Sequence, residues 1–238
     1  MMQTVRVPLA SNALYVSGTV NGIEKTWTRE EGNYWSTTAE TTEDGIYEVV
    51  LSIIYGDGKT TEDSITLYYG INLITDRTQL DVDTGTEKGY YNYIDLNRVE
   101  SAVSMLSGLL ASLPDEMKEY AKELGVGWDV FFDVPYDQET YSQMKTYVLW
   151  KESDFPVKSE MERYLSNVVL LRNALEYETS DLPSSMIKLS YTGANAIEKA
   201  LEDLHPVIGE KREEIKDHLE KTAKSWYFSN EIYCGEVI

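Results

Sequence analysis

The chain has 238 residues, 42% hydrophobic and 26% charged, a composition typical of a globular protein with one large domain or two modest ones. Its 41 acidic residues outnumber 21 basic ones, giving a formal net charge of −20 at pH 7. Nucleic acid is bound through clustered lysine and arginine, so this charge argues against a nucleic-acid partner. No segment approaches the length of a membrane span, and we expect no membrane partner.

Residues 4–69 show the two-residue period of β-strands. Asn21-Gly22 predicts a tight hairpin between two of them. Two further strands present apolar residues on one face at period two: Tyr47, Val49, Leu51, Ile53 and Tyr55, then Ile65, Leu67 and Tyr69. Short strands separated by turns predict a small antiparallel β-sandwich of about six strands over residues 1–70.

The phrase Asp44-Gly45-Ile46-Tyr47 resembles the corner before a late strand of immunoglobulin-like (Ig-like) domains. In such corners a tyrosine hydroxyl bonds back to the backbone. Trp27, Tyr34 and Trp35 lie in or near the predicted loops of this segment, where aromatic side chains can contact a ligand, for example a host surface glycan. The alternative is that these three residues close the core of a small sandwich.

Residues 71–92 are predicted to be a polar connector. Asp81, Asp83 and Glu87 alternate as in the start of a calcium loop, but the glycine and the final glutamate of an EF-hand are missing. His205 and His218 have no partner motif. We therefore interpret the acidic stretch as a solvated linker and expect no metal or other cofactor.

Residues 93–238 are predicted to be a helical module, an antiparallel bundle of three or four helices. The predicted caps are Asp95, the Ser159–Glu162 capping box and Thr192. Pro114 is expected to open a separate short helix, and Pro206 to kink or split the last helix near His205. Residues 125–141 are expected to hold one or two short strands, and residues 142–150 are compatible with either strand or helix. The fold class is thus α+β and multi-domain, with the Ig-like sandwich preceding the bundle.

The chain closes on an aromatic cluster after a charged helix. Trp226, Tyr227 and Phe228 continue the apolar stripe of that helix, and residues 232–238, which include Tyr233, are expected to form an extended arm. These side chains either pack against the chain's own bundle or contact a neighbouring subunit. The single cysteine, Cys234, excludes an internal disulfide framework and is interpreted as a small structural hydrophobe.

Motifs of known catalytic chemistry are absent from the sequence. There is no GxSxG elbow, no GxxxxGK[ST] loop and no GxGxxG after a strand. Asp129, Asp133 and Asp137 recur every four residues, but such spacing arises by chance in so acidic a chain. We therefore predict that the protein is not an enzyme and has no catalytic residues.

Five phrases between residues 73 and 237 occur in a specific order: LITDRTQLDV, YYNYIDLNRVESAV, DFPVKSEMERYLSNVVLLRNAL, LSYTGANAIEKAL and WYFSNEIYCGEV. They resemble, in this order, a module of structural, tail-associated proteins of phages and prophages from gut Firmicutes. Asn230 and Cys234 depart from the glycine and alanine of that pattern. An Ig-like segment ahead of the module also resembles how these proteins are built.

The resemblance implies a bacteriophage virion structural protein that is made in the host cytoplasm, and the tail or baseplate is its preferred position. It implies other virion proteins as partners, with the chain forming a homo-oligomer or contacting ring-forming neighbours. A head decoration or fibre protein is the first alternative. A carbohydrate-binding module for host recognition, using Trp27, Tyr34 and Trp35, is the second.

Overall fold

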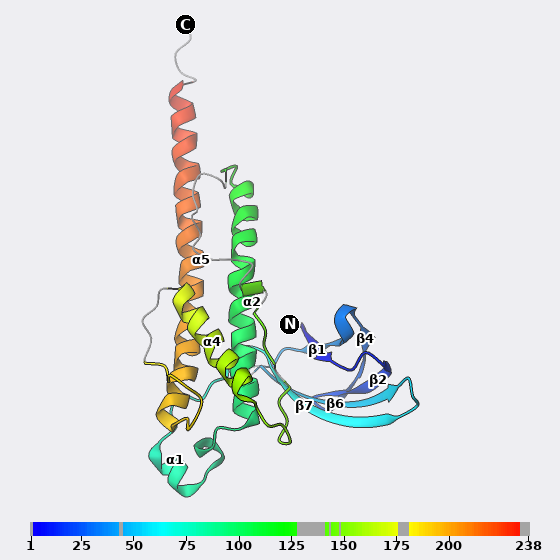
Figure 1. Cartoon of the computed structure of the whole chain (residues 1–238). Helices are drawn as coiled ribbons and strands as arrows, with labels where there is room; N and C mark the ends of the chain where they lie inside the picture. The colour runs from blue at the N-terminus through cyan, green and yellow to red at the C-terminus, as the bar shows by residue number, and fades with distance from the viewer. Residues whose placement is uncertain are drawn as a thin grey trace. The chain divides into compact units, whose positions relative to one another are not determined.

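The computed structural model describes residues 2–42, 45–127, 141–142, 144–147, 149–175 and 181–233, with side chains up to residue 225. The protein is α+β, with strands mostly in the N-terminal part and helices in the C-terminal part (Figure 1). It divides into two compact units. Unit 1 comprises Met1–Asn72, Asn92–Ala102 and Tyr147–Asp154, and unit 2 comprises Leu73–Tyr91, Val103–Thr146 and Phe155–Ile238.

Unit 1 contains two antiparallel sheets. Strands β1 (Met2–Pro8), β5 (Tyr34–Glu40) and β4 (Thr28–Arg29) form the first, in that order. Strands β3 (Ile23–Thr26), β2 (Ala13–Val20), β6 (Ile46–Tyr55) and β7 (Thr60–Tyr68) form the second, in that order. The described residues thus contain one strand more than predicted, because the short β4 adds a third strand to the first sheet.

The predicted alternation and hairpin are confirmed. Tyr47, Val49, Leu51 and Ile53 are at most 1% exposed, and they share one core with buried residues of both sheets. Strands β2 and β3 pair with Val20 opposite Ile23, and the intervening Asn21 and Gly22 have φ angles of 51° and 75°. Two left-handed residues in a two-residue loop are the geometry that Asn-Gly favours.

Two tyrosine hydroxyls of unit 1 accept hydrogen bonds from the backbone. Tyr47 is fully buried, and its hydroxyl accepts a hydrogen bond from the Thr42 N–H at 3.3 Å, as the corner resemblance predicted. The rings of Tyr47 and Tyr69 meet edge to face at 5.4 Å. The Tyr69 hydroxyl accepts from the Arg6 N–H at 3.0 Å, which connects the end of β7 to β1 in the other sheet.

The described residues include helices α1 (Gln79–Thr84), α2 (Tyr93–Glu123), α4 (Lys158–Ala174) and α5 (Tyr191–Tyr233), with 3-10 turns η1 (Glu31–Asn33) and η2 (Glu87–Gly89). Tyr141 and Ser142 are helical as well. The connector predicted for residues 71–92 therefore holds α1 and η2. No helix in the described ranges is long and apolar enough to cross a membrane.

Both prolines that were expected to separate helices lie inside them. Pro114 lies within α2 and Pro206 within α5, so the separate short helix and the split are wrong. A proline removes one helical hydrogen bond, but packing on both sides can compensate. Buried apolar residues flank each proline: Leu110, Leu113 and Met117 around the first, Leu204 and Ile208 around the second.

The helices begin slightly earlier than predicted. The residues that precede α2, α4 and α5 are Asn92, Val157 and Ser190 rather than Asp95, Ser159 and Thr192. The Asn92 side chain accepts from the Ile94 N–H at 2.8 Å, while the Asp95 carboxylate accepts from the Asn92 N–H at 2.7 Å. Asp95 is thus the reciprocal partner of the cap rather than the cap itself.

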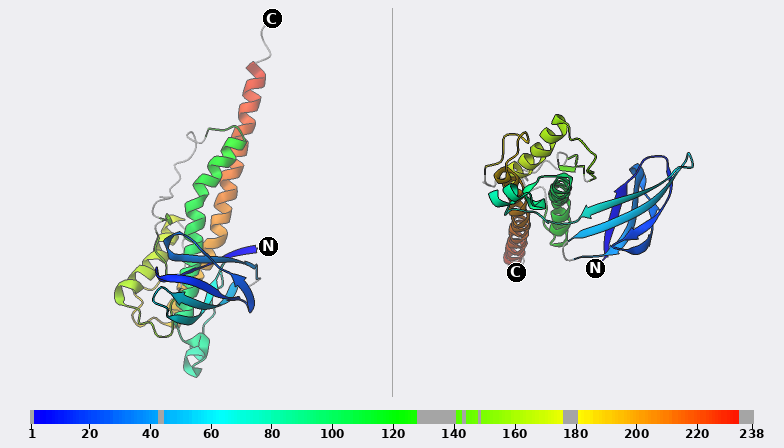
Figure 2. Two further views of the ribbon diagram at one scale, coloured as in Figure 1. Left: turned by 90° about the vertical axis from the view of Figure 1, so that its right-hand side faces the viewer. Right: turned by 90° about the horizontal axis from the view of Figure 1, so that it is seen from below.

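Within unit 2, the second half of α2 runs alongside α5 in the same direction (Figures 1 and 2). Glu116 on α2 pairs with Arg212 on α5 at 3.2 Å. One turn further along α2, the Tyr120 hydroxyl donates to Glu220, which lies further along α5, at 2.8 Å. This pair of helices is parallel, which differs from the antiparallel arrangement predicted. The long connection that contains α4 lets the chain return before α5 begins.

Helix α5 continues to Tyr233, through the aromatic cluster of residues 226–228. Ile232 and Tyr233 are therefore helical, and their assignment to an extended arm is wrong. Residues 234–238, with Cys234, lie outside the described part, as do residues 128–140, where short strands and the Asp129, Asp133 and Asp137 repeat were considered.

Candidate functional site

The most enclosed group of charged side chains among the described residues of unit 2 is centred on Arg77 and Glu198. The Arg77 Nη2 donates to one Glu198 carboxylate oxygen at 2.6 Å, and the Ile74 N–H donates to the other at 2.5 Å. The two charged side chains are 1% and 0% exposed. Because water is excluded, each charge depends on the other and on backbone dipoles for compensation.

The first turns of α5 also bind the backbone of the LITDRT segment. The Asn195 side-chain oxygen accepts from the Arg77 N–H at 3.0 Å, and its Nδ2 donates to the Arg77 carbonyl at 2.9 Å. The Arg77 Nη1 donates a hydrogen bond to the Ile74 carbonyl at 2.5 Å. An extended segment without a strand partner thus obtains its backbone hydrogen bonds from a helix side chain, as buried backbone requires.

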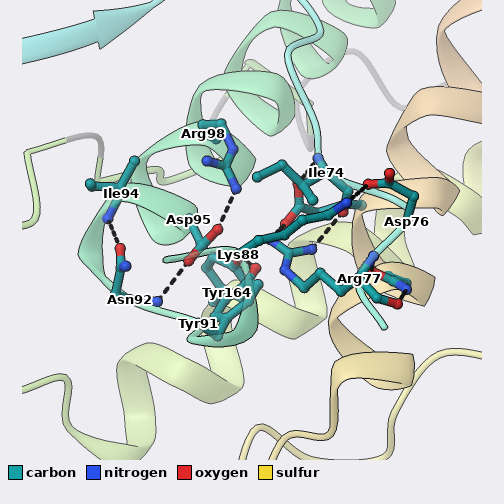
Figure 3. A network of polar contacts seen from close by, with 12 residues as sticks. Ile74, Asp76, Arg77, Lys88, Tyr91, Asn92, Ile94, Asp95, Arg98 and Tyr164 are labelled. Carbon is teal, nitrogen blue, oxygen red and sulfur yellow. Dashed lines mark hydrogen bonds and ion pairs between the residues drawn. The ribbon is translucent and has the colours of Figure 1, made fainter. Parts of the chain in front are cut away.

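Two tyrosines extend this network to α4. The Arg77 guanidinium lies over the Tyr91 ring, 5.3 Å from its centroid. The hydroxyls of Tyr91 and Tyr164 share a hydrogen bond, and Tyr164 on α4 is 1% exposed (Figure 3). The network therefore joins the phrases LITDRT, YYNY, SEMERYL and YTGANAIEK inside the fold. Its charged groups are inaccessible to a substrate.

A second set of polar contacts lies within unit 1. The Asn97 side chain accepts from the Trp150 N–H at 2.8 Å and donates to the Trp150 carbonyl at 2.9 Å. Arg98 forms an ion pair with Asp95 one turn earlier on α2 (Figure 3). The phrase YYNYIDLNRVESAV, which contains Asp95, Asn97 and Arg98, thus also uses polar side chains for internal contacts.

An apolar groove of about 540 Å³ lies in unit 2 along one face of α4. Its walls include Met161, Leu165 and Val169 from the helix and Met186 and Ile187 from the segment opposite. Ile187 is 67% exposed. Methionine side chains adapt their shape to a partner, and exposed apolar surface of this kind favours contact with protein.

A smaller and more polar groove of about 370 Å³ lies in unit 1. It is lined by β7, by the first turn of α2 and by residues 149–152. Strand β7 is an edge strand of its sheet.

The aromatic residues proposed as ligand contacts have different environments. Trp27 and Trp35 are each 6% exposed and belong to the core of unit 1, as the alternative interpretation of the sequence had them. Tyr34 is 39% exposed, and the Arg6 guanidinium lies 5.0 Å from its ring centroid. The structure does not bring the three rings together on an open surface. The side chains of Trp226, Tyr227, Phe228 and Tyr233 lie outside the described residues.

The acidic stretch in the predicted connector caps a helix. Asp81 accepts from the N–H and hydroxyl of Thr78, at 2.8 and 2.6 Å, and these hydrogen bonds hold its pKa below the ordinary value. Gly85 ends α1 in a left-handed conformation. Among the described residues no three histidine, cysteine or acidic side chains group as metal ligands. His205 and His218 both lie on α5.

Comparison with models of protein families, with curated protein sequences and with solved structures gives no match to this chain. The interpretation of both units therefore depends on their own geometry and on the sequence phrases.

Sequence reasoning did not identify Arg77 and Glu198 as a pair. A signal was nevertheless present, because Glu198 lies in the apolar stripe of α5, with Ala194, Ile197 and Leu201 at helical spacing and at most 1% exposed. A carboxylate in such a stripe needs a buried cation or donor. The sequence could have predicted that Glu198 has a partner, although not which one.

Proposed function

We propose that the protein is a non-enzymatic structural component of a bacteriophage virion, placed in the tail or baseplate, where it mediates assembly. Its five phrases resemble those of phage structural proteins. Unit 1 would be the Ig-like sandwich of that architecture, and the helices of unit 2 its module for contacts with other virion proteins. The resembling family is usually encoded among tail or other virion genes, which supports a virion component; the tail or baseplate is the preferred position, and the head decoration and fibre roles are the alternatives.

The observation that carries the proposal is the use of the phrase residues inside the fold. Arg77 and Glu198 are as buried as core leucines and bind each other, Ile74 and Asn195. Catalysis by a charged side chain needs that side chain to reach a substrate. The phrases thus specify how distant segments pack, which is what a structural protein requires of its sequence.

The apolar groove along α4 supports a role in assembly. It is lined largely by apolar side chains, and Ile187 at its wall is 67% exposed. Next to it in the sequence, Phe155 and Val157 are 90% and 55% exposed. Such side chains stabilise contacts with a neighbouring subunit when they are removed from water.

Electron cryo-microscopy of intact virions from a phage or prophage that encodes the chain tests this proposal. We expect density for the chain in the tail or baseplate, at a copy number that matches the symmetry there. Absence of the chain from purified particles by mass spectrometry would contradict the proposal, as would turnover of cell-wall material by the purified protein.

A pair of matched variants tests the groove. Ile187 and Leu80 have nearly equal exposure, 67% and 68%, but only Ile187 lines the groove. We expect Ile187→Ser to reduce incorporation into particles severalfold, with the circular dichroism spectrum and Tm unchanged, and Leu80→Ser to be incorporated normally. Equal incorporation of both variants would exclude the groove as an assembly contact.

A further inference from the structure

The polar groove of unit 1 has walls that are fixed by specific contacts. On one side, the two hydrogen bonds between the Asn97 amide and the Trp150 backbone, at 2.8 and 2.9 Å, attach residues 149–152 to α2. On the other, the Lys151 ammonium contacts both carboxylate oxygens of Asp63 on β7, at 2.7 and 2.8 Å. The groove is therefore shaped before any ligand arrives, which reduces the entropic cost of binding.

The side chains that line the groove combine aromatic faces with hydrogen-bonding groups. Tyr68 and Tyr93 contribute rings, and Ser64, Thr66 and Glu152 contribute hydroxyl and carboxylate groups. Within the described part of the chain, no hydrogen bond to another protein group engages any of these five side chains. This is unlike the Asn97 amide, whose oxygen and nitrogen are both used.

The charges around the groove disfavour an anionic ligand. Glu152 contributes a carboxylate, and the only cation in the lining, Lys151, is already paired with Asp63. Burial raises the pKa of the Tyr68 hydroxyl, so this group stays neutral and able to donate at physiological pH. The lining thus offers neutral donors and acceptors with one negative charge.

The orientation of β7 side chains distinguishes two kinds of ligand. Ser64, Thr66 and Tyr68 alternate with the buried Ile65 and Leu67, so they share the face of the strand that points away from the core. A ligand in the groove meets these side chains rather than only the backbone of the strand edge. This favours a molecule recognised through hydroxyl groups and ring stacking over a peptide that adds as a strand.

We propose that this groove binds a neutral oligosaccharide. The apolar faces of sugar rings stack on Tyr68 and Tyr93, while sugar hydroxyls bond to Ser64, Thr66 and Glu152. A volume of about 370 Å³ lies at the small end of the range of roughly 300–1,000 Å³ for small-molecule sites, so the groove accepts a short segment of a glycan. The inference goes beyond the structural role proposed above and does not depend on it.

The purified 238-residue chain is tested on an array of neutral, amino and acidic glycans, and the neutral oligosaccharide that binds most strongly is then titrated by calorimetry. We expect Tyr93→Ala to weaken binding at least tenfold and Glu152→Gln to weaken it severalfold. Tyr15→Ala is the matched control, because Tyr15 is 59% exposed in the same unit but does not line the groove. The affinity of this variant for the oligosaccharide should stay within twofold of that of the parent protein.

Three results would overturn the inference: no neutral glycan binds, the acidic glycans bind best, or Tyr93→Ala and Glu152→Gln bind as well as the parent. Binding of extended peptides instead of glycans would assign the groove to a protein partner and would overturn it too. Since the experiment uses isolated protein, its failure would leave the virion proposal intact. Conversely, absence from virions would not affect glycan binding.

Discussion

Glu198 holds the Arg77 guanidinium at 2.6 Å in a site where both side chains are almost completely removed from water, 121 residues apart in the sequence. The same carboxylate also receives the Ile74 N–H, so one side chain of α5 compensates a buried charge and a buried backbone group. The position of the LITDRT segment in unit 2 depends on this carboxylate.

We therefore predict that Glu198→Ala destabilises the protein by about 3–5 kcal/mol, because it leaves the Arg77 charge buried without a partner. Urea unfolding followed by circular dichroism measures the change. Glu202→Ala is the control: Glu202 pairs with Lys199 on the same helix, but both side chains are more than 40% exposed. Its cost should not exceed about 1 kcal/mol.

The double variant Arg77→Met with Glu198→Leu should cost less than the sum of the two single losses, because no isolated charge then remains buried. A Glu198→Ala protein as stable as the parent would show that water reaches Arg77, contrary to the burial of both side chains.

Two glycines with similar backbone angles should respond differently to alanine. Gly22 has a φ of 75°, and an added Cβ would meet open space. Gly22→Ala should therefore lower the free energy of unfolding only by the strain of a left-handed alanine backbone, about 1–2 kcal/mol. Gly45 has a φ of 66°, and an added Cβ would lie 1.8 Å from the Tyr69 carbonyl oxygen. Thermal unfolding should show a clearly larger loss for Gly45→Ala, and similar Tm values would contradict the close approach.

The N-terminal cap of α1 should be visible as a shifted titration. Hydrogen bonds from Thr78 hold the pKa of Asp81 below its ordinary value, so the stabilisation is present above the unfolded pKa near 3.9 and is lost as pH falls through the folded pKa. Thr78→Val should raise the Asp81 pKa in a carbon-detected NMR titration. An unchanged pKa would show that the Thr78 hydroxyl is not its main cause.

An opposite pH dependence is expected from Tyr69. Burial raises its pKa above the ordinary value of about 10, so the neutral hydroxyl is favoured in the fold. This stabilisation is fully present below pH 10 and is lost as pH rises through the folded pKa. Tyr69→Phe should therefore lose less stability than the parent between pH 9 and pH 11, as measured by urea unfolding, and an equal loss in both proteins would contradict this contribution of Tyr69.

Local patterns in the sequence predicted the strands of unit 1 well. The period of two from Tyr47 to Ile53 and the Asn21-Gly22 turn each depend on neighbouring residues alone, which is why both are confirmed. The start of α2 was missed by one turn because Asn92 and Asp95 are both good capping residues and, in the structure, both take part.

Features that depend on distant residues could not be predicted in the same way. Pro114 and Pro206 are signals for helix ends, but apolar packing around each maintains the helix. The parallel direction of α2 and α5 follows from the path of the connection between them, and the partner of Glu198 lies 121 residues earlier in the chain. The spacing of residues in the sequence indicates neither the direction of α5 relative to α2 nor the residue that pairs with Glu198.

The length of α5 has a mechanical consequence. At 1.5 Å per residue, its 43 residues form a rod of about 65 Å, anchored near its first turns by Asn195 and Glu198. Anything attached to the far end would be held at a set spacing from the LITDRT segment. Inserting seven residues near the middle should lengthen this spacing by about 10 Å while keeping the same face of the rod toward its neighbours.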